Sequence, residues 1–182
     1  MPDSFSPDSL RRIRRLALVV RTLSLIGVVV IGTMPFLFWA QPDWVAEVVI
    51  QQWAIAKIQL DMESRLGGLA GSLIPTAVSV FALWQMWSLF GCFARGELLA
   101  RQPALHLRRL GLALCTLALA QPVGRTLSIL ALTWGNPKGE RQLWVGLSSD
   151  HYLSLLFGLL LLALAQVLAE AARVADENAE FV

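Results

Sequence analysis

The chain has 182 residues, of which 56% are hydrophobic and 15% are charged. A soluble domain averages about 45–50% apolar and about 25% charged residues, so this composition indicates a membrane protein. The formal net charge of +2 is too small to indicate a direct nucleic-acid partner. Cys92 and Cys115 lie near the ends of apolar runs at the face predicted to be cytoplasmic. We expect both thiols to be reduced and to serve packing.

Four apolar stretches are each long enough to cross a bilayer as an α-helix. A hydrocarbon core of about 30 Å takes about 20 helical residues, and a backbone in lipid must satisfy its own hydrogen bonds. The alternating pattern of a membrane β-barrel strand is absent. The sequence therefore predicts an all-α fold, a four-transmembrane-helix bundle that forms a single domain. The spans are expected at residues 16–39, 69–92, 110–134 and 152–172, followed by a short acidic tail at 173–182.

Arginines precede the first span, as basic residues precede a secretory signal peptide. The apolar stretch is too long for a signal peptide, however, and the bulky Phe38-Trp39-Ala40 does not resemble a cleavage site of small residues. We therefore expect a signal anchor that is retained in the mature protein.

Lys and Arg side chains are distributed unevenly between the two faces that the spans define. Nine lie on one face and four on the other, and the cytoplasmic loops of membrane proteins carry the excess. This predicts a multi-pass protein of the bacterial inner membrane, with both termini and the loop 93–109 in the cytoplasm. The nine are Arg11, Arg12, Arg14, Arg15, Arg95, Arg101, Arg108, Arg109 and Arg173, and the four are Lys57, Arg65, Lys138 and Arg141.

The two loops on the outer face differ in character. In the first, residues 41–68, apolar side chains from Trp44 to Leu60 recur at near-helical spacing, which predicts a fifth helix. An interfacial helix that lies on the outer leaflet explains this spacing best, and a short helix packed over the bundle is the alternative. The second loop, residues 135–150, carries the turn signal Asn136-Pro137-Lys138-Gly139. Tryptophans at the ends of these loops are expected at the outer interface, namely Trp39, Trp44, Trp53, Trp134 and Trp144.

The inner loop between the second and third spans is basic. Pro103 suits the first turn of a helix that continues into the third span. Four arginines are expected at headgroup level, where contact with anionic membrane lipids is the favoured interpretation and binding of a cytoplasmic protein is the alternative. They are Arg95, Arg101, Arg108 and Arg109.

The segment from Phe90 to Gly111 combines an aromatic-rich stretch, an Arg-Gly step and an Arg-Arg-Leu-Gly entry to the next helix. The chain closes with a span that runs into an acidic tail and Phe181-Val182. In these features it resembles a family of small bacterial membrane proteins, domain of unknown function 2975, although the family usually has Phe at the position of Leu99. The resemblance implies four helices and no activity. Some relatives are encoded beside small helix-turn-helix regulators, which implies a membrane partner for a transcription factor.

Polar side chains within the spans are the main candidates for a functional site, because each costs free energy to insert. Gln121 and Arg125 lie one turn apart in the third span, next to Pro122, which removes a helix hydrogen bond. They could bind an anionic ligand, or they could be a kink with an arginine that snorkels outward, and the second interpretation is favoured. Gln85 and Gln166 lie at similar depth in the inner half, and we expect a hydrogen bond between them.

Small residues at spacings of four could bring helices close together. They are Gly67-xxx-Gly71 in the second span and Ala120-xxx-Gly124-xxx-Ser128 in the third, and they could serve the bundle or a homo-oligomer. Sequence motifs of hydrolases, nucleotide-binding loops and metal sites are absent, and His106 and His151 are expected at opposite faces. We therefore expect no catalytic residues, no cofactor and no metal.

Two functions follow as hypotheses. The first is a non-enzymatic inner-membrane protein that senses or regulates, binding a cytoplasmic regulatory protein through its inner loop and acidic tail. The alternative is a subunit of a small-molecule or lipid transporter or exporter, built around Arg125. The acidic tail could also touch the basic loop of the same or a neighbouring subunit.

Overall fold

The computed structural model describes residues 7–53, 58–97, 100–137, 141 and 143–180. These residues form helices and connecting segments and include no strand. Four helices are long and apolar enough to cross a membrane, so the all-α fold with four spans is confirmed for this membrane protein. The helices are α1 (Pro7–Ala40), α2 (Pro42–Gln52), α3 (Met62–Ala94), α4 (Arg101–Thr133) and α5 (Ser149–Glu180), and all but α2 are candidate spans.

The helices extend past the apolar runs that predicted them. α3 begins at Met62 rather than near Leu69, and α4 includes Pro103 in its first turn, as expected. α5 continues through most of the predicted acidic tail, to Glu180. Phe181-Val182, Leu99, Lys57 and the second half of the predicted outer turn, Lys138-Gly139, lie outside the described residues.

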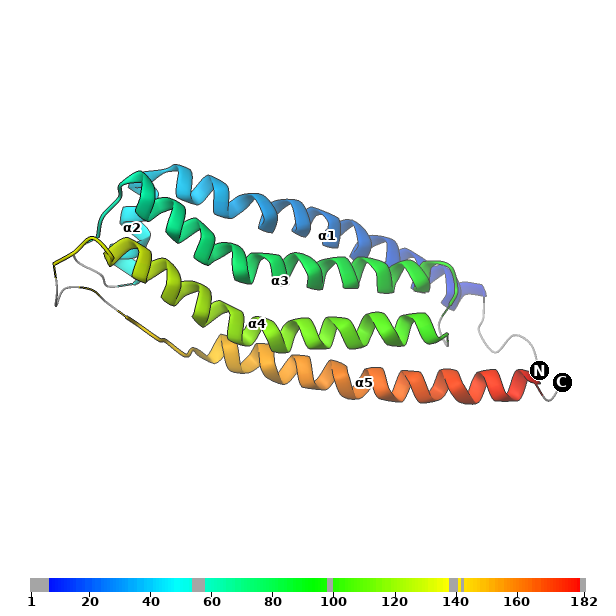
Figure 1. The fold of residues 1–182 in the computed structure, drawn as a ribbon. Helices are drawn as coiled ribbons and strands as arrows, with labels where there is room; N and C mark the ends of the chain where they lie inside the picture. Colours follow the sequence, from blue (N-terminus) through cyan, green and yellow to red (C-terminus); the bar gives the residue numbers. More distant parts are fainter. Residues whose placement is uncertain (1–6, 54–57, 98–99, 138–140, 142, 181–182) are drawn as a thin grey trace.

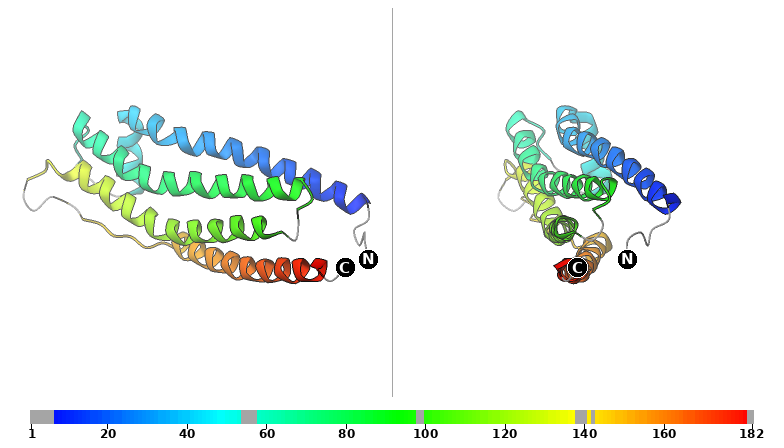
Figure 2. Two further views of the ribbon diagram at one scale, coloured as in Figure 1. Left: turned by 45° about the vertical axis from the view of Figure 1, so that its right-hand side comes forward. Right: turned by 90° about the vertical axis from the view of Figure 1, so that its right-hand side faces the viewer.

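The four long helices lie side by side in an open row (Figure 1). α1 packs against α3, α3 against α4, and α4 against α5, whereas no contact between α1 and α4 or between α1 and α5 is found within the described residues. The end-on view in Figure 2 shows α1 and α5 at the two ends of this row. Both end helices therefore present large apolar side chains outward, such as Leu23 and Leu159, as helices in contact with lipid do.

Small residues hold α3 and α4 close together. A Cβ atom on Gly71 would lie 2.7 Å from the Ser128 hydroxyl, and one on Gly124 would lie 2.7 Å from the Gly71 carbonyl oxygen. The Ser128 hydroxyl donates a hydrogen bond of 2.9 Å to the carbonyl oxygen of Gly68. The predicted small-residue faces thus serve contact between helices of one chain.

α4 and α5 meet in the same way. A Cβ atom on Gly111 would lie 2.9 Å from the carbonyl oxygen of Gly158. A Cβ atom on Gly158 would in turn lie 2.6 Å from the Cys115 sulfur. Cys92 and Cys115 are both free thiols within helices, and Cys115 packs at this contact. Sequence reasoning missed this pair because the two glycines stand alone rather than in a repeated spacing.

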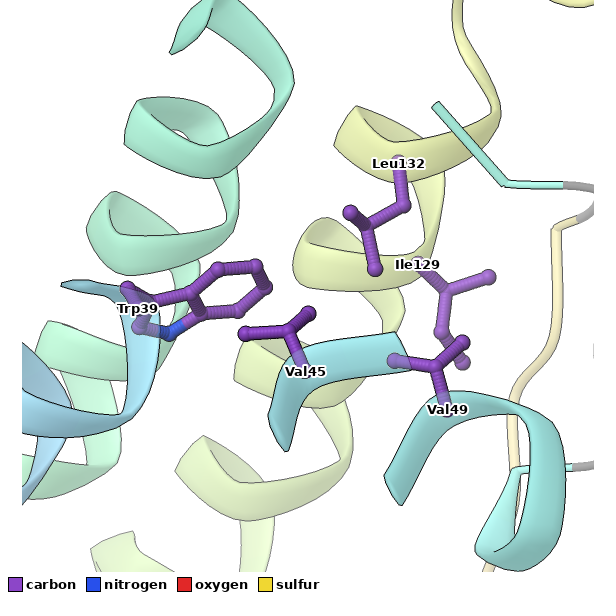
Figure 3. Close-up of a cluster of buried hydrophobic side chains, with 5 residues drawn as sticks. All are labelled: Trp39, Val45, Val49, Ile129 and Leu132. Carbon is purple, nitrogen blue, oxygen red and sulfur yellow. The ribbon is translucent and has the colours of Figure 1, made fainter. Parts of the chain in front are cut away.

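The short helix α2 packs over the bundle. Its side chains Val45 and Val49 are fully buried against Trp39 of α1 and against Ile129 and Leu132 of α4 (Figure 3). The helix is therefore packed over the bundle, as the alternative placement has it, while its expected position in the interface of the outer leaflet stays a prediction. The helix ends at Gln52, so Leu60 lies beyond it, and residues 54–57 are outside the described part of the chain.

The C-terminal end of α1 is fixed by a residue of α3. The chain leaves α1 after Ala40 because Pro42 begins the next helix, so the last carbonyl groups of α1 lack helical donors. Arg65 supplies one, since its Nε donates a hydrogen bond of 2.8 Å to the Trp39 carbonyl oxygen. A cation at a helix C-terminus also interacts favourably with the helix dipole.

The glycine contact gives a first prediction. Gly124→Ala places a methyl group against the backbone of α3, and we expect a loss of about 1–3 kcal/mol in stability, as for other overpacked interiors. Gly32→Ala is the matched control, because a Cβ there would lie 4.0 Å from Val80, which is ordinary contact. Thermal unfolding of both purified variants in the same detergent measures the difference. Equal midpoints for the two variants would contradict the close α3–α4 contact.

Candidate functional site: an apolar cavity with an arginine in its wall

An apolar cavity of about 510 Å³ lies between α1, α3 and α4 toward the ends of these helices near α2. It exists because α1 and α4 both pack on α3, while their backbones do not approach each other within the described residues. α2 bridges the two, since its valines pack against both α1 and α4. The lining residues are Ile31, Met34, Pro35, Phe38 and Trp39 of α1, Trp44 and Trp53 around α2, Ser72, Pro75 and Thr76 of α3, and Gln121, Gly124, Arg125 and Ser128 of α4.

Each of the three helices around the cavity contains a proline. Pro35 and Pro75 line it directly, and Pro122 lies beside Gln121 in α4. A proline inside a helix removes one hydrogen bond and bends the axis. Figure 1 shows α4 changing direction about half-way along its length, which agrees with the predicted kink.

Arg125 is held between two tryptophans at the cavity wall. Its guanidinium carbon lies 4.5 Å from the ring centroid of Trp144 and 5.4 Å from that of Trp53, both cation–π distances. The Nε atom is buried and has no hydrogen-bond partner among the described residues. The described residues that line the cavity include no carboxylate. The positive charge is therefore stacked on aromatic rings without an anionic partner from the described chain.

The position of Trp144 depends on the residue that follows Arg125. The hydroxyl of Thr126 donates a hydrogen bond of 2.8 Å to the carbonyl oxygen of Trp144. This bond fixes the second outer loop along α4 and keeps the indole ring over the guanidinium group. The sequence placed Trp144 at the outer interface but gave no sign that it covers Arg125.

Gln121 and Arg125 both line the cavity, whereas Gln85 and Gln166 do not. The prediction of a hydrogen bond between Gln85 and Gln166 is wrong. Gln85 is buried and its Oε1 lies 2.9 Å from Nδ1 of His106, whose N–H donates to it, whereas Gln166 is exposed on α5. The physical reason is that α4 lies between α3 and α5, so equal depth in the membrane does not bring the two glutamines together.

The basic residues of the inner loop do not converge on one site. Arg95 pairs with Glu97 at 2.8 Å, and the guanidinium group holds the pKa of that carboxyl below its usual range. Arg101, Arg108 and Arg109 are exposed, as expected of residues at headgroup level. Their contact with lipid or with a protein stays a prediction.

The acidic tail makes its ion pairs within α5. Arg173 pairs with Glu170 and Glu177 on the same helix. No ion pair joins the tail to the inner loop among the described residues, so the proposed contact within one subunit is not found there. No group of three or more potential metal ligands occurs in the described part of the chain.

Comparison with known proteins places these features in a family. The family described as "Protein of unknown function (DUF2975)" matches residues 34–182. The chain belongs to this family. The match confirms the resemblance seen in the sequence and extends it toward the N-terminus, so that it takes in α2 and every cavity-lining residue except Ile31. No curated protein and no solved structure matches the DUF2975 chain.

The pairing of Gln85 gives a second prediction. Gln85→Met removes the acceptor for His106 at a buried site, and we expect a loss of about 1 kcal/mol in stability, typical of a hydrogen bond between membrane helices. Gln166→Met makes the same chemical change on an exposed face of α5 and should leave stability unchanged. Thermal unfolding in detergent measures both. Equal losses for the two variants would instead support the pairing of Gln85 with Gln166 that the sequence predicts.

Proposed function

We propose that this DUF2975 protein is a non-enzymatic protein of the bacterial inner membrane that binds an anionic amphiphile in the cavity at Arg125. In the orientation that the basic residues predict, both termini lie in the cytoplasm and the cavity lies in the outer half of the membrane. The ligand would then enter from the outer leaflet or the periplasmic side.

The observation that carries the proposal is the Nε–H group of Arg125, which is buried and has no acceptor among the described residues. A cation within a span costs about 2.5–3.5 kcal/mol to insert. The buried Nε–H without an acceptor adds to this cost, because a polar group removed from water loses its hydrogen bonds. A carboxylate or phosphate at this point would supply both the acceptor and the opposite charge.

The walls of the cavity indicate the rest of the ligand. They are largely aromatic and aliphatic, and Gln121 offers one further polar contact a helical turn from Arg125. A volume of about 510 Å³ falls within the usual range for small-molecule sites, about 300–1,000 Å³. An anionic head joined to an acyl or aromatic group fits both the charge and the apolar lining.

A second candidate function, regulation through the cytoplasmic face, is favoured by the shape of α5. Its inner end projects beyond the ends of α3 and α4 (Figure 1) and carries the exposed residues Asp176 and Glu177. A projecting acidic helix is accessible to a cytoplasmic protein. A ligand-binding sensor would use both ends of the molecule, whereas a transporter subunit would use the cavity alone.

Binding at Arg125 can be tested with a pair of probes that quench tryptophan fluorescence. A dibrominated fatty acid and its methyl ester share one apolar chain and differ only in the carboxylate. In the wild-type protein we expect the acid to quench at lower concentration than the ester. Arg125→Leu should weaken binding of the acid about ten-fold, the value of a charge-assisted hydrogen bond, and leave the ester unchanged.

Arg141→Leu is the matched control, because Arg141 also stacks on a tryptophan, at 5.0 Å from the Trp134 ring centroid, but is exposed and lines no part of the cavity. In the Arg141→Leu variant, the acid should quench tryptophan fluorescence at the same concentration as in the wild type, and so should the ester. If the acid and the ester quench alike in all three proteins, the cavity does not select an anion and the proposed function is wrong.

The regulatory candidate has its own test. Deleting residues 176–182 should remove any cytoplasmic protein that copurifies with the intact chain, because the exposed acidic end of α5 would be missing. The same deletion should not change quenching by the brominated acid. An unchanged set of copurifying proteins would count against docking through the tail.

A further inference from the structure

A second arginine with an unpaired Nε lies at the opposite end of the molecule, between α1 and α3. The guanidinium carbon of Arg21 lies 4.5 Å from the ring centroid of Trp87. Its Nε is buried and has no hydrogen-bond partner among the described residues. In the predicted orientation this position is close to the inner headgroup region, one to two turns before α3 ends at Ala94.

Gly91 allows a second arginine to face the same spot. A Cβ atom on Gly91 would lie 3.7 Å from the guanidinium carbon of Arg21 and 3.7 Å from the terminal nitrogen Nη1 of Arg95. These two cationic groups therefore approach one point from two sides. Because glycine has no side chain, both guanidinium groups can lie this close to the backbone of α3, and we call this place the notch at Gly91.

The carboxylate nearest to this notch is already engaged on the far edge of Arg95. Gly96, with φ of +84°, ends α3 and turns the chain so that Glu97 returns to Arg95. Arg95 then donates to Glu97 through Nε at 2.8 Å and through Nη2 at 3.0 Å, and Nη2 also lies 3.3 Å from the Cys92 sulfur. Nη1 is left facing the notch. Arg21 has no ion pair with a described carboxylate.

Two guanidinium groups at one point repel each other unless an anion lies between them. Arginine presents a planar set of N–H donors that matches the oxygens of a phosphate group. Basic pockets between membrane helices on the cytoplasmic side bind the phosphates of lipid headgroups. We propose that Arg21 and Arg95 bind a phosphate group that bridges their guanidinium groups beside Gly91, either the phosphodiester of an anionic lipid or a free phosphate.

This site is separate from the cavity at Arg125 and does not depend on the proposed function. It also differs from the exposed arginines of the inner loop. Arg108, for example, carries the same charge near the same predicted membrane face, but it is exposed and makes no cation–π contact among the described residues. Arg108→Gln is therefore a control for the general attraction of a basic surface to anionic lipid.

The test compares variants of the full chain, purified in detergent, by native mass spectrometry. The wild type should retain phosphatidylglycerol in preference to phosphatidylcholine. Arg21→Gln and Arg95→Gln should each lower retention of phosphatidylglycerol about ten-fold, whereas Arg108→Gln should lower it little. A second arm adds inorganic phosphate to lipid-free protein and measures the midpoint of thermal unfolding.

The two arms separate the sources of the phosphate. Selective loss of phosphatidylglycerol, with no effect of inorganic phosphate, identifies a lipid headgroup. A rise in the midpoint with inorganic phosphate that Arg21→Gln abolishes identifies a free phosphate. The proposal is overturned if the three arginine variants lose lipid equally and inorganic phosphate shifts no midpoint.

Gly91→Ala is a matched control that changes the site but keeps both arginines. The added methyl group meets both guanidinium groups at ordinary contact distances, so the helix should fold with both charges in place. We therefore expect phosphate and phosphatidylglycerol binding close to that of the wild type. A loss in Gly91→Ala as large as that in Arg21→Gln would contradict binding through the two guanidinium groups.

Discussion

The close contact between α3 and α4 determines where the polar residues of the third span point. Gly124 faces the backbone of α3 at Gly71, so the next residue, Arg125, is turned about 100° around the helix into the space between α4 and α1. That space remains open because α1 packs on α3 and not on α4. α2 then covers its outer end, since Val45 and Val49 pack against both neighbours. The cavity is thus a consequence of helix packing.

Two arginines share an unusual environment at opposite ends of this arrangement. Arg21 and Arg125 each stack on tryptophan and each keep a buried Nε without a partner in the described chain. A cation–π contact contributes about 0.5–2 kcal/mol, which is less than the cost of about 2.5–3.5 kcal/mol for a cation at the centre of a span. For Arg125, which lies further inside its span, the rings therefore offset only part of the cost of insertion. At both positions an anion would supply the missing hydrogen-bond acceptor, which is why we propose both as binding sites.

Much of the fold could be predicted because the length and composition of an apolar run decide whether it spans a bilayer. Gln121 and Arg125 were placed on one face because residues one turn apart in a helix are neighbours, and both line the cavity. Such local rules do not predict which helices are neighbours. Gln85 and Gln166 lie at similar depth in the membrane, which suggests a pair, but α4 lies between their helices and keeps them apart. The approach of Arg21 to the inner end of α3 depends on the register between two helices, which composition does not encode.

The central claim is that Arg125 holds an unsatisfied donor that an anionic ligand completes. The most direct measurement is the ¹⁵N–¹H signal of the Arg125 Nε–H group in protein labelled at arginine, assigned by its loss in Arg125→Leu. The account predicts that the brominated fatty acid shifts this signal downfield and slows its exchange with water, and that the methyl ester does neither. A signal that responds to neither probe, or equally to both, would contradict the account.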